Sequence, residues 1–233
     1  MLFRSDATGD EEAAGEQSDG SIEWRYAAAM YAAYTTLVDR WFGRLRGKLQ
    51  ESPGWSDALL IVTAASGQSL GEHGAIEDET PRLRSELAQT PLWIRVPGSD
   101  QGGTRRQDVV QAIDLAPTLL DWFCAPGTDL DSKAGCSLLP CVGNEQYPRR
   151  DHVILGNGRS EWGLRTPEFF YVESGDRDLD SQAPPHLFEK PADRWDQSDV
   201  LSQYPDVAEE LRSTLRSQID ALTTRGGDMG WTD

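Results

Sequence analysis

The side chains of this sequence that could do chemistry gather in residues 61–74, which read IVTAASGQSLGEHG. An apolar run ends there in a glycine-rich loop, and loops at the carboxyl end of a buried strand carry the chemistry of many α/β enzymes. His73 could contact a substrate or donate a proton to a leaving group. The alternative is a structural turn in which neighbouring groups satisfy Glu72 and His73. We keep His73 as a candidate substrate-binding residue.

The two positions where the chain leaves the strand carry no such chemistry. Ala65 has no donor atom, and Ser66 offers only a neutral hydroxyl. Calcium and similar hard cations are held by several oxygen ligands, and carboxylate charge sets much of their affinity. The loop therefore predicts no catalytic residue, no metal ligand at position 65 or 66, and no cofactor.

The amino-acid composition limits the kinds of partner that this protein could bind. The 233 residues carry a formal net charge of −17, which argues against nucleic acid, because phosphate backbones are bound by clustered Lys and Arg. No apolar run approaches the roughly 20 residues that cross a bilayer, and no secretory leader opens the sequence. We therefore expect no membrane association and, by default, a cytoplasmic location.

The cysteines Cys124, Cys136 and Cys141 form no zinc pattern and are expected to be free thiols. A disulfide between Cys136 and Cys141 is left open as an alternative.

The elements around the loop follow from hydrophobic periodicity. Residues 1–20 are acidic and poor in apolar side chains, which predicts disorder. Residues 22–49 predict a helix, and an unalternating apolar run at 58–63 predicts a strand buried on both faces, as in a parallel sheet. A second strand is expected at 91–96. The helix carries an apolar stripe at spacings of three or four residues: Ile22, Tyr26, Met30, Ala33, Leu37, Trp41 and Leu45.

The second half of the chain has shorter elements. Residues 114–123 predict a helix capped by Asp114. Its expected buried face consists of Leu115, Leu119, Leu120 and Phe123. Four aromatic-rich segments after residue 151 predict a small antiparallel sheet, and 204–222 an amphipathic closing helix. The expected divisions are an acidic tail (1–20), an α/β region (21–125), a connection (126–150) and a small β-plus-helix subdomain (151–225).

Several of these segments resemble, in order, the carboxyl-terminal half of a sulfatase. They are ALLIVT, AASGQSLGEHG, TPLWIRVPG, AIDLAPTLLDWF, GCSLLP and WGLRTPEFFYV. The resemblance covers about residues 22–222 and is to the arylsulfatase-like members of the alkaline phosphatase superfamily. It implies an α/β fold: part of a sulfatase-like sheet with flanking helices, followed by a small antiparallel β lobe with a carboxyl-terminal helix.

The resemblance implies sulfuric ester hydrolysis by a formylglycine made in a C/S-x-P-x-R motif, with a divalent cation, usually calcium. That motif and the first pair of metal ligands belong upstream of the region that this sequence matches. Cys124 begins a C-x-P stretch, but Thr128 stands where the motif needs arginine, so no nucleophile is expected there. The second ligand pair, Asp-His or Asp-Asn, would fall at Ala65 and Ser66, so the metal-binding loop is degenerate.

Three hypotheses follow for the function. The first is a truncated, degenerate sulfatase homologue that is inactive as this chain. The second is a sulfate or phosphate ester hydrolase whose missing half is encoded upstream or supplied by a partner chain. The third is a module that binds a sulfated small molecule or glycan through residues 67–74 and basic side chains such as Arg105 and Arg106. In this chain alone, strands 58–63 and 91–96 would lack neighbours and expose unpaired edges that favour aggregation or association.

Overall fold

The computed structural model of the chain describes residues 19–73, 83–123, 135–142, 150–157, 161–174 and 184–227. The chain divides into two compact units, described separately below. One contains residues 1–52 and 69–78, and the other contains residues 53–68 and 79–233. Among the described residues, no helix combines the length and apolar character needed to cross a membrane.

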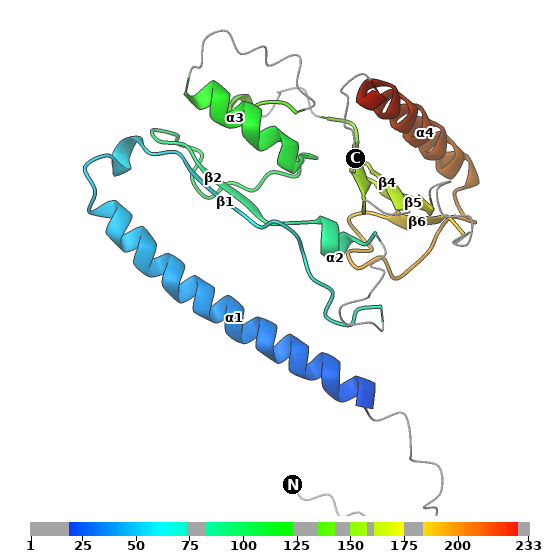
Figure 1. Cartoon of the computed structure of the whole chain (residues 1–233), viewed down its shortest axis with the longest axis horizontal. Coiled ribbons are helices and arrows are strands. Elements are labelled where there is room, and N and C mark those ends of the chain that lie inside the picture. The colour runs from blue at the N-terminus through cyan, green and yellow to red at the C-terminus, as the bar shows by residue number, and fades with distance from the viewer. Residues whose placement is uncertain are drawn as a thin grey trace, which may run out of the picture. The chain divides into compact units, whose positions relative to one another are not determined.

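Helix α1 (Asp19–Gln50) is a single long helix in the first unit (Figure 1). Alanine-rich sequence favours the helix, and the Ser52-Pro53-Gly54 segment that follows does not continue it. The helix predicted at 22–49 is confirmed, and it begins slightly earlier. Of the predicted acidic tail, only the last two residues are described, and they belong to α1. The apolar stripe is exposed: Tyr26 68%, Leu37 47%, Trp41 58% and Leu45 54%.

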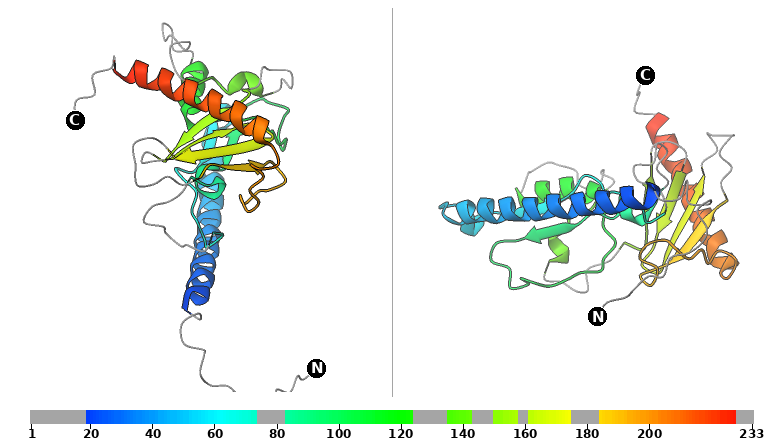
Figure 2. Two further views of the ribbon diagram at one scale, coloured as in Figure 1. Left: turned by 90° about the vertical axis from the view of Figure 1, so that its right-hand side faces the viewer. Right: turned by 90° about the horizontal axis from the view of Figure 1, so that it is seen from below.

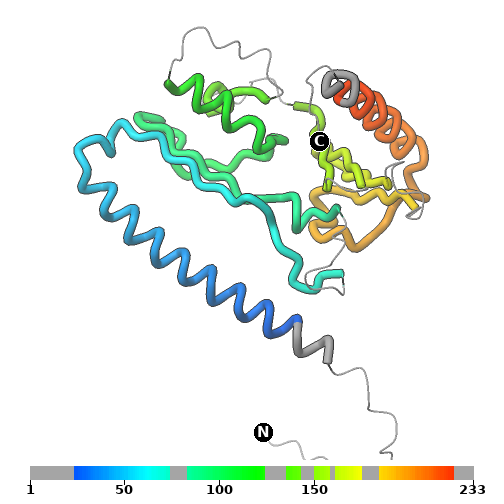
Figure 3. The backbone as a smooth tube through the Cα atoms, viewed as in Figure 1, coloured from blue at the N-terminus to red at the C-terminus, as the bar shows by residue number. Residues whose placement is uncertain are grey.

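Two short strands in the second unit form a sheet of their own. Strand β1 (Leu60–Thr63) pairs antiparallel with β2 (Leu92–Arg95), Leu60 opposite Arg95 and Thr63 opposite Leu92 (Figure 3). The prediction that residues 58–63 form a strand of a parallel sheet, buried on both faces, is wrong for this pair. A parallel pairing requires a crossover connection, usually through a long helix. The helix in the described part of the segment between the strands is α2 (Ser85–Ala88), which has four residues.

The helix predicted at 114–123 is observed as α3 (Leu115–Trp122), and a 3₁₀ turn, η2 (Ala112–Asp114), precedes it. Its buried residues are Pro117 and Thr118, not the predicted apolar set. The hydroxyl of Thr118 donates to the carbonyl of Asp114 and accepts from the amide of Leu138, just before the 3₁₀ turn η3 (Leu139–Cys141). Leu119 is instead 42% exposed and Phe123 73%. The packed face of α3 is thus the one that meets residues 135–138.

The predicted antiparallel sheet is confirmed. Its strands are β3 (Val153–Gly156), β4 (Glu161–Arg165), β5 (Phe169–Ser174) and β6 (His186–Glu189), in that order across the sheet. The closing helix α4 (Pro205–Gly227) lies across one face, against β4 and β5 (Figures 1 and 2).

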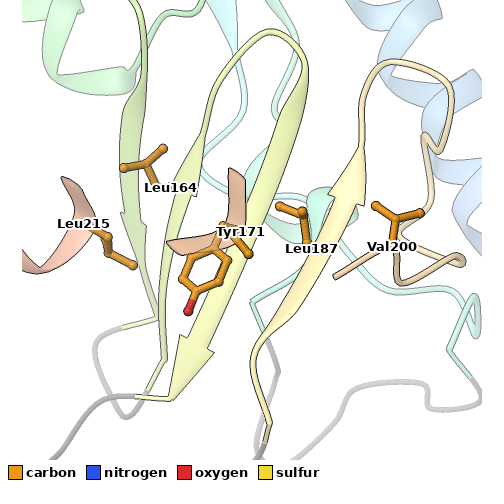
Figure 4. Close-up of a cluster of buried hydrophobic side chains, with 6 residues drawn as sticks. Leu164, Tyr171, Leu187, Val200 and Leu215 are labelled. Atoms are coloured by element: carbon orange, nitrogen blue, oxygen red, sulfur yellow. The ribbon is translucent and has the colours of Figure 1, made fainter. Parts of the chain in front are cut away.

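Side chains that alternate along these strands build a hydrophobic core on each face of the sheet. Leu164, Tyr171 and Leu187 are register neighbours on β4, β5 and β6, and they pack against Leu215 of α4 (Figure 4). Successive strand residues point to opposite faces, so the neighbours of Tyr171 and Leu187 along β5 and β6 lie on the other face of the sheet. These neighbours are Phe170, Val172 and Phe188, and they form the second core together with Leu83, which precedes α2.

Candidate functional site

The loop after β1 is held by backbone contacts in the second unit. The amide of Gly67 donates to the carbonyl of Leu87 at 2.9 Å. A Cβ atom at position 67 would lie 1.7 Å from the carbonyl oxygen of Glu86, so only glycine fits this approach. Ala65 and Ser66, just before this contact, are exposed. The course of the loop is therefore set by the close approach of two backbone segments.

The Gly-Glu-His part of the loop belongs to the first unit and is organised locally. The carboxylate of Glu72 accepts a hydrogen bond from the amide of Leu70 at 2.6 Å, across Gly71, whose φ is +99°. This contact supports the structural alternative for Glu72. His73 is half-buried. Its role as a substrate contact remains a prediction.

The residues at the end of β1 do not fit the calcium ion that the resemblance implies. Ala65 presents a methyl group, and Ser66 presents an exposed neutral hydroxyl, where a carboxylate and an imidazole or amide would be required. Nor do the described residues contain a group of three or more His, Cys, Asp or Glu side chains that could hold a metal ion. No chemical step is therefore derived through a metal here.

The densest polar cluster in the second unit surrounds Asp114, which is 1% exposed. Asp114 occupies the N-cap position of α3, as predicted, but its side chain makes no hydrogen bond to the first turn of α3 and instead closes the capping box of η2. Its carboxylate accepts from the amides of Gln111 (2.8 Å) and Cys136 (2.9 Å), and from both terminal nitrogens of Arg150 (2.9 and 2.8 Å). Burial lowers the pKa of Arg150, but the hydrogen bond and charge of Asp114 outweigh burial and raise it. The cluster fixes the start of α3.

A second buried polar cluster ties the returning loop to the small sheet. Asp196, 3% exposed, accepts from the amide (2.7 Å) and the hydroxyl (2.9 Å) of Ser85, and it forms a buried ion pair with Lys190. Its φ of +54° is unusual for a residue other than glycine. Sequence reasoning missed this cluster, because its members are far apart in the chain and no local motif marks them.

An apolar cleft of about 450 Å³ lies between β1 with its preceding residues and α3. Among the described residues that line it, Asp57 is the one with an ionisable side chain. The other lining residues are Ala58, Leu59, Ile61, Leu115, Leu119, Trp122 and Phe123. Sequence reasoning missed the cleft because it assigned Leu119 and Phe123 to a covered face. Because Leu119 and Phe123 are exposed, the wall of the cleft that they form is an apolar surface open to solvent.

The basic residues proposed for glycan binding lie in the loop after β2. Arg105 and Arg106 are both exposed. The guanidinium of Arg106 donates to the carboxylate of Asp108 at 2.7 Å.

The free thiols expected at Cys136 and Cys141 are confirmed, and Cys124 lies outside the described residues. Burial, followed by the charge of Asp108, raises the pKa of the Cys141 thiol.

Comparison with known proteins decides the family. The family model described as Sulfatase matches residues 4–125, which include α1, β1, the loop and α3. The chain belongs to the sulfatase family. This confirms the resemblance to sulfatases. The degenerate metal-binding positions Ala65 and Ser66 remain a prediction.

Two curated sulfatases illustrate the relationship. The N-acetylglucosamine-6-O-sulfatase of Bacteroides thetaiotaomicron is 28% identical over 167 residues, covering 64% of this chain and 28% of the relative. Arylsulfatase K of Danio rerio is 26% identical over 207 residues, covering 85% of this chain and 38% of the relative. The chain therefore spans well under half the length of either protein.

Solved sulfatases share the fold. The structure of BT4656 in complex with its substrate D-glucosamine-2-N,6-O-disulfate aligns with a TM-score of 0.66 and 23% identity, over 88% of this chain and 43% of that chain. BT1596, a 2-O GAG sulfatase, aligns with a TM-score of 0.71 and 20% identity, over 85% of this chain and 44% of that chain. The predicted α/β class with a small antiparallel lobe is confirmed.

Proposed function

We propose that these 233 residues are the carboxyl-terminal portion of a sulfatase and do not hydrolyse sulfate esters by themselves. The observation that carries the proposal is the pair Ala65 and Ser66 at the end of β1, where the family places two metal ligands. A loop with no carboxylate there contributes little to holding a hard divalent cation. Without the cation, the developing charge on the ester oxygens would lose its main stabilising partner.

The ligand class of the assembled protein is proposed to be a sulfated sugar. Two relatives support this: one is named for N-acetylglucosamine 6-O-sulfate, and the other was solved with a disulfated glucosamine. In this chain, His73 is the side chain proposed to contact such a ligand. It is half-buried in the loop.

The proposal is tested with the purified chain and 4-nitrophenyl sulfate, with glucosamine 6-sulfate as a second substrate. We expect no turnover above a buffer blank, with or without added calcium, and no heat of binding when calcium is titrated in. An active arylsulfatase in the same buffers is the positive control. Turnover that EDTA abolishes, or saturable calcium binding by the chain alone, would refute the proposal.

A second candidate function is ester hydrolysis by a complex in which another polypeptide supplies the rest of the sulfatase fold. The observation favouring it is that strongly apolar surface stays uncovered in this chain: the stripe of α1, and the exposed Leu119 and Phe123 of α3. It is tested by repeating the assays on the chain purified together with its bound proteins. Activity in the complex and none in the free chain is the expected result. His73→Ala would then lower kcat/KM for the sugar sulfate.

A further inference from the structure

Two of the cysteines lie on one short segment, Cys-Ser-Leu-Leu-Pro-Cys (136–141), separated by four residues. Both are free thiols, and Cys136 is exposed whereas Cys141 is half-buried. The 3₁₀ turn η3 closes the segment, because the amide of Cys141 donates to the carbonyl of Leu138 at 3.1 Å. A disulfide needs its two Cα atoms within roughly 7 Å of each other, a span that a segment folded back by such a turn can adopt.

The backbone of this segment is fastened to α3 and to the residue before it. The amide of Cys136 donates to the carboxylate of Asp114 at 2.9 Å, and the amide of Leu138 donates to the hydroxyl of Thr118 at 2.9 Å. Both acceptors are fully buried. The segment therefore presents its two thiols from a fixed backbone, and the ends of so short a segment meet at a smaller entropic cost than the ends of a long one.

The two thiols act on each other and on the buried ion pair at the start of α3. Burial, followed by the charge of Asp108, raises the pKa of the Cys141 thiol, and the charge of Cys136 raises it further. Burial lowers the pKa of Arg150, whereas the hydrogen bond and charge of Asp114 raise it, and so do the charge and a hydrogen bond of Cys136. The sulfur of Cys136 is thus held by the guanidinium that also binds Asp114.

The surroundings of the two thiols differ in a way that sets an order of reaction. The thiolate is the form that attacks a disulfide, and the rate also depends on access to the sulfur atom. Cys136 is exposed, whereas Cys141 is half-buried and its raised pKa keeps it protonated. A disulfide arriving from solvent therefore meets Cys136 first.

We propose that Cys136 and Cys141 form a reversible disulfide, a redox-sensitive switch at the start of α3, with a small-molecule disulfide such as oxidised glutathione as the oxidant. The thiolate of Cys136 attacks one sulfur of oxidised glutathione, the glutathione S–S bond breaks, and one glutathione leaves and takes up a proton. Cys141 loses its proton to solvent and attacks the sulfur of Cys136, and the second glutathione leaves in the same way. Two protein thiols are oxidised to one disulfide, and one glutathione disulfide is reduced to two thiols.

The new bond competes with the ion pair that holds α3. It draws the sulfur of Cys136 toward Cys141 and away from Arg150, so the disulfide and the contact with Arg150 oppose each other. Such coupling is reciprocal: oxidation loosens one contact of the cluster around Asp114, and weakening that contact favours oxidation. Neither thiol belongs to the loop on which the proposed function rests.

The test uses the whole chain with Cys124→Ser, so that Cys136 and Cys141 are its only thiols. The protein is equilibrated with mixtures of reduced and oxidised glutathione, quenched with acid and weighed by mass spectrometry. We expect the loss of two hydrogen atoms, a cross-link within residues 136–141, and full recovery in dithiothreitol. Cys141→Ser should stop at one glutathionyl group on Cys136. Cys136→Ser should take up glutathione about tenfold more slowly, because its remaining thiol is half-buried.

Arg150→Lys tests the link to the ion pair, because lysine keeps the charge but not the forked donors. It should be half-oxidised at an oxidised-to-reduced glutathione ratio about fivefold lower, the value of one net hydrogen bond. Asp151→Ala, at an exposed neighbouring position, is the matched control and should not shift this ratio. Circular dichroism would verify that each variant is folded.

Four results would overturn the proposal. They are two thiols that stay free in oxidised glutathione alone, a disulfide between two copies of the chain in place of one within it, a glutathionyl group on Cys136 that Cys141 does not displace, and equal ratios for Arg150→Lys and Asp151→Ala. Turnover of 4-nitrophenyl sulfate by the chain would refute the proposed function and leave these thiol measurements unaffected.

Discussion

Replacing Asp114 by alanine is expected to lower the free energy of unfolding by about 5 kcal/mol. The side chain is almost fully buried and accepts four hydrogen bonds, two from backbone amides and two from Arg150. Removing one member of a buried ion pair costs roughly 3–5 kcal/mol. Each amide left without its acceptor adds roughly 1–3 kcal/mol. The side chain of Arg150 is 23% exposed and can partly rehydrate, so the lower part of the summed range applies.

The measurement is urea unfolding followed by circular dichroism and tryptophan fluorescence. Asp151→Ala, at an exposed neighbouring position, is the control and should change stability by less than about 0.5 kcal/mol. A double-mutant cycle with Arg150→Met should give a double variant that is more stable than the sum of the two single changes predicts, because no buried charge is left unpaired. A loss below about 1 kcal/mol in Asp114→Ala would refute the assignment of this cluster as the anchor of α3.

Three further predictions concern the core, pH and the loop. Leu215→Ala, at a fully buried position in the core between α4 and the sheet, should cost about 2–5 kcal/mol in urea unfolding. Burial raises the pKa of Asp199, but hydrogen bonds from two backbone amides and from His186 outweigh it and hold the pKa below its usual value. The contribution of Asp199 to the stability of the fold is therefore present above about pH 4, and it is lost as pH falls through the pKa of Asp199 in the folded protein. Asp199→Asn should accordingly lower Tm at pH 7 and flatten the decline of Tm in acid. Gly67→Ala should speed proteolysis of the loop, whereas Gly102→Ala, with nothing within 4 Å of the added Cβ, should leave it unchanged.

The regular elements could be predicted because their signals are local. Helix α1 follows from alanine content and apolar spacing within one segment, and the four strands of the small sheet follow from short aromatic runs between turns. The pairing of β1 could not be predicted in the same way. Its neighbour is chosen by the course of a connection of nearly thirty residues, and the apolar run in β1 is equally consistent with either orientation.

The buried faces were harder to predict than the elements. Periodicity correctly indicates that Leu119 and Phe123 lie on an apolar side of α3, but it does not indicate whether a covering segment exists within the chain. Likewise, the residue type of Asp114 suits a helix cap, and nothing nearby in sequence shows that Arg150, 36 residues later, binds the same carboxylate. Contacts between distant segments decide both outcomes, and a single sequence does not encode them in any local pattern.

Completion of the fold by another polypeptide and the residue types at positions 65 and 66 affect catalysis independently of each other. A polypeptide that supplied the rest of the sulfatase fold would leave Ala65 and Ser66 in place, because the loop that carries them is fixed from within this chain by Gly67 against Glu86 and Leu87. Assembly alone therefore restores the fold but not the ligands at these two positions. An assembled complex that hydrolyses a sugar sulfate would have to draw its metal ligands, or another source of positive charge, from the added polypeptide. Calcium titration of the complex separates these cases: binding that survives Ser66→Ala would show that no side chain at these two positions is a ligand.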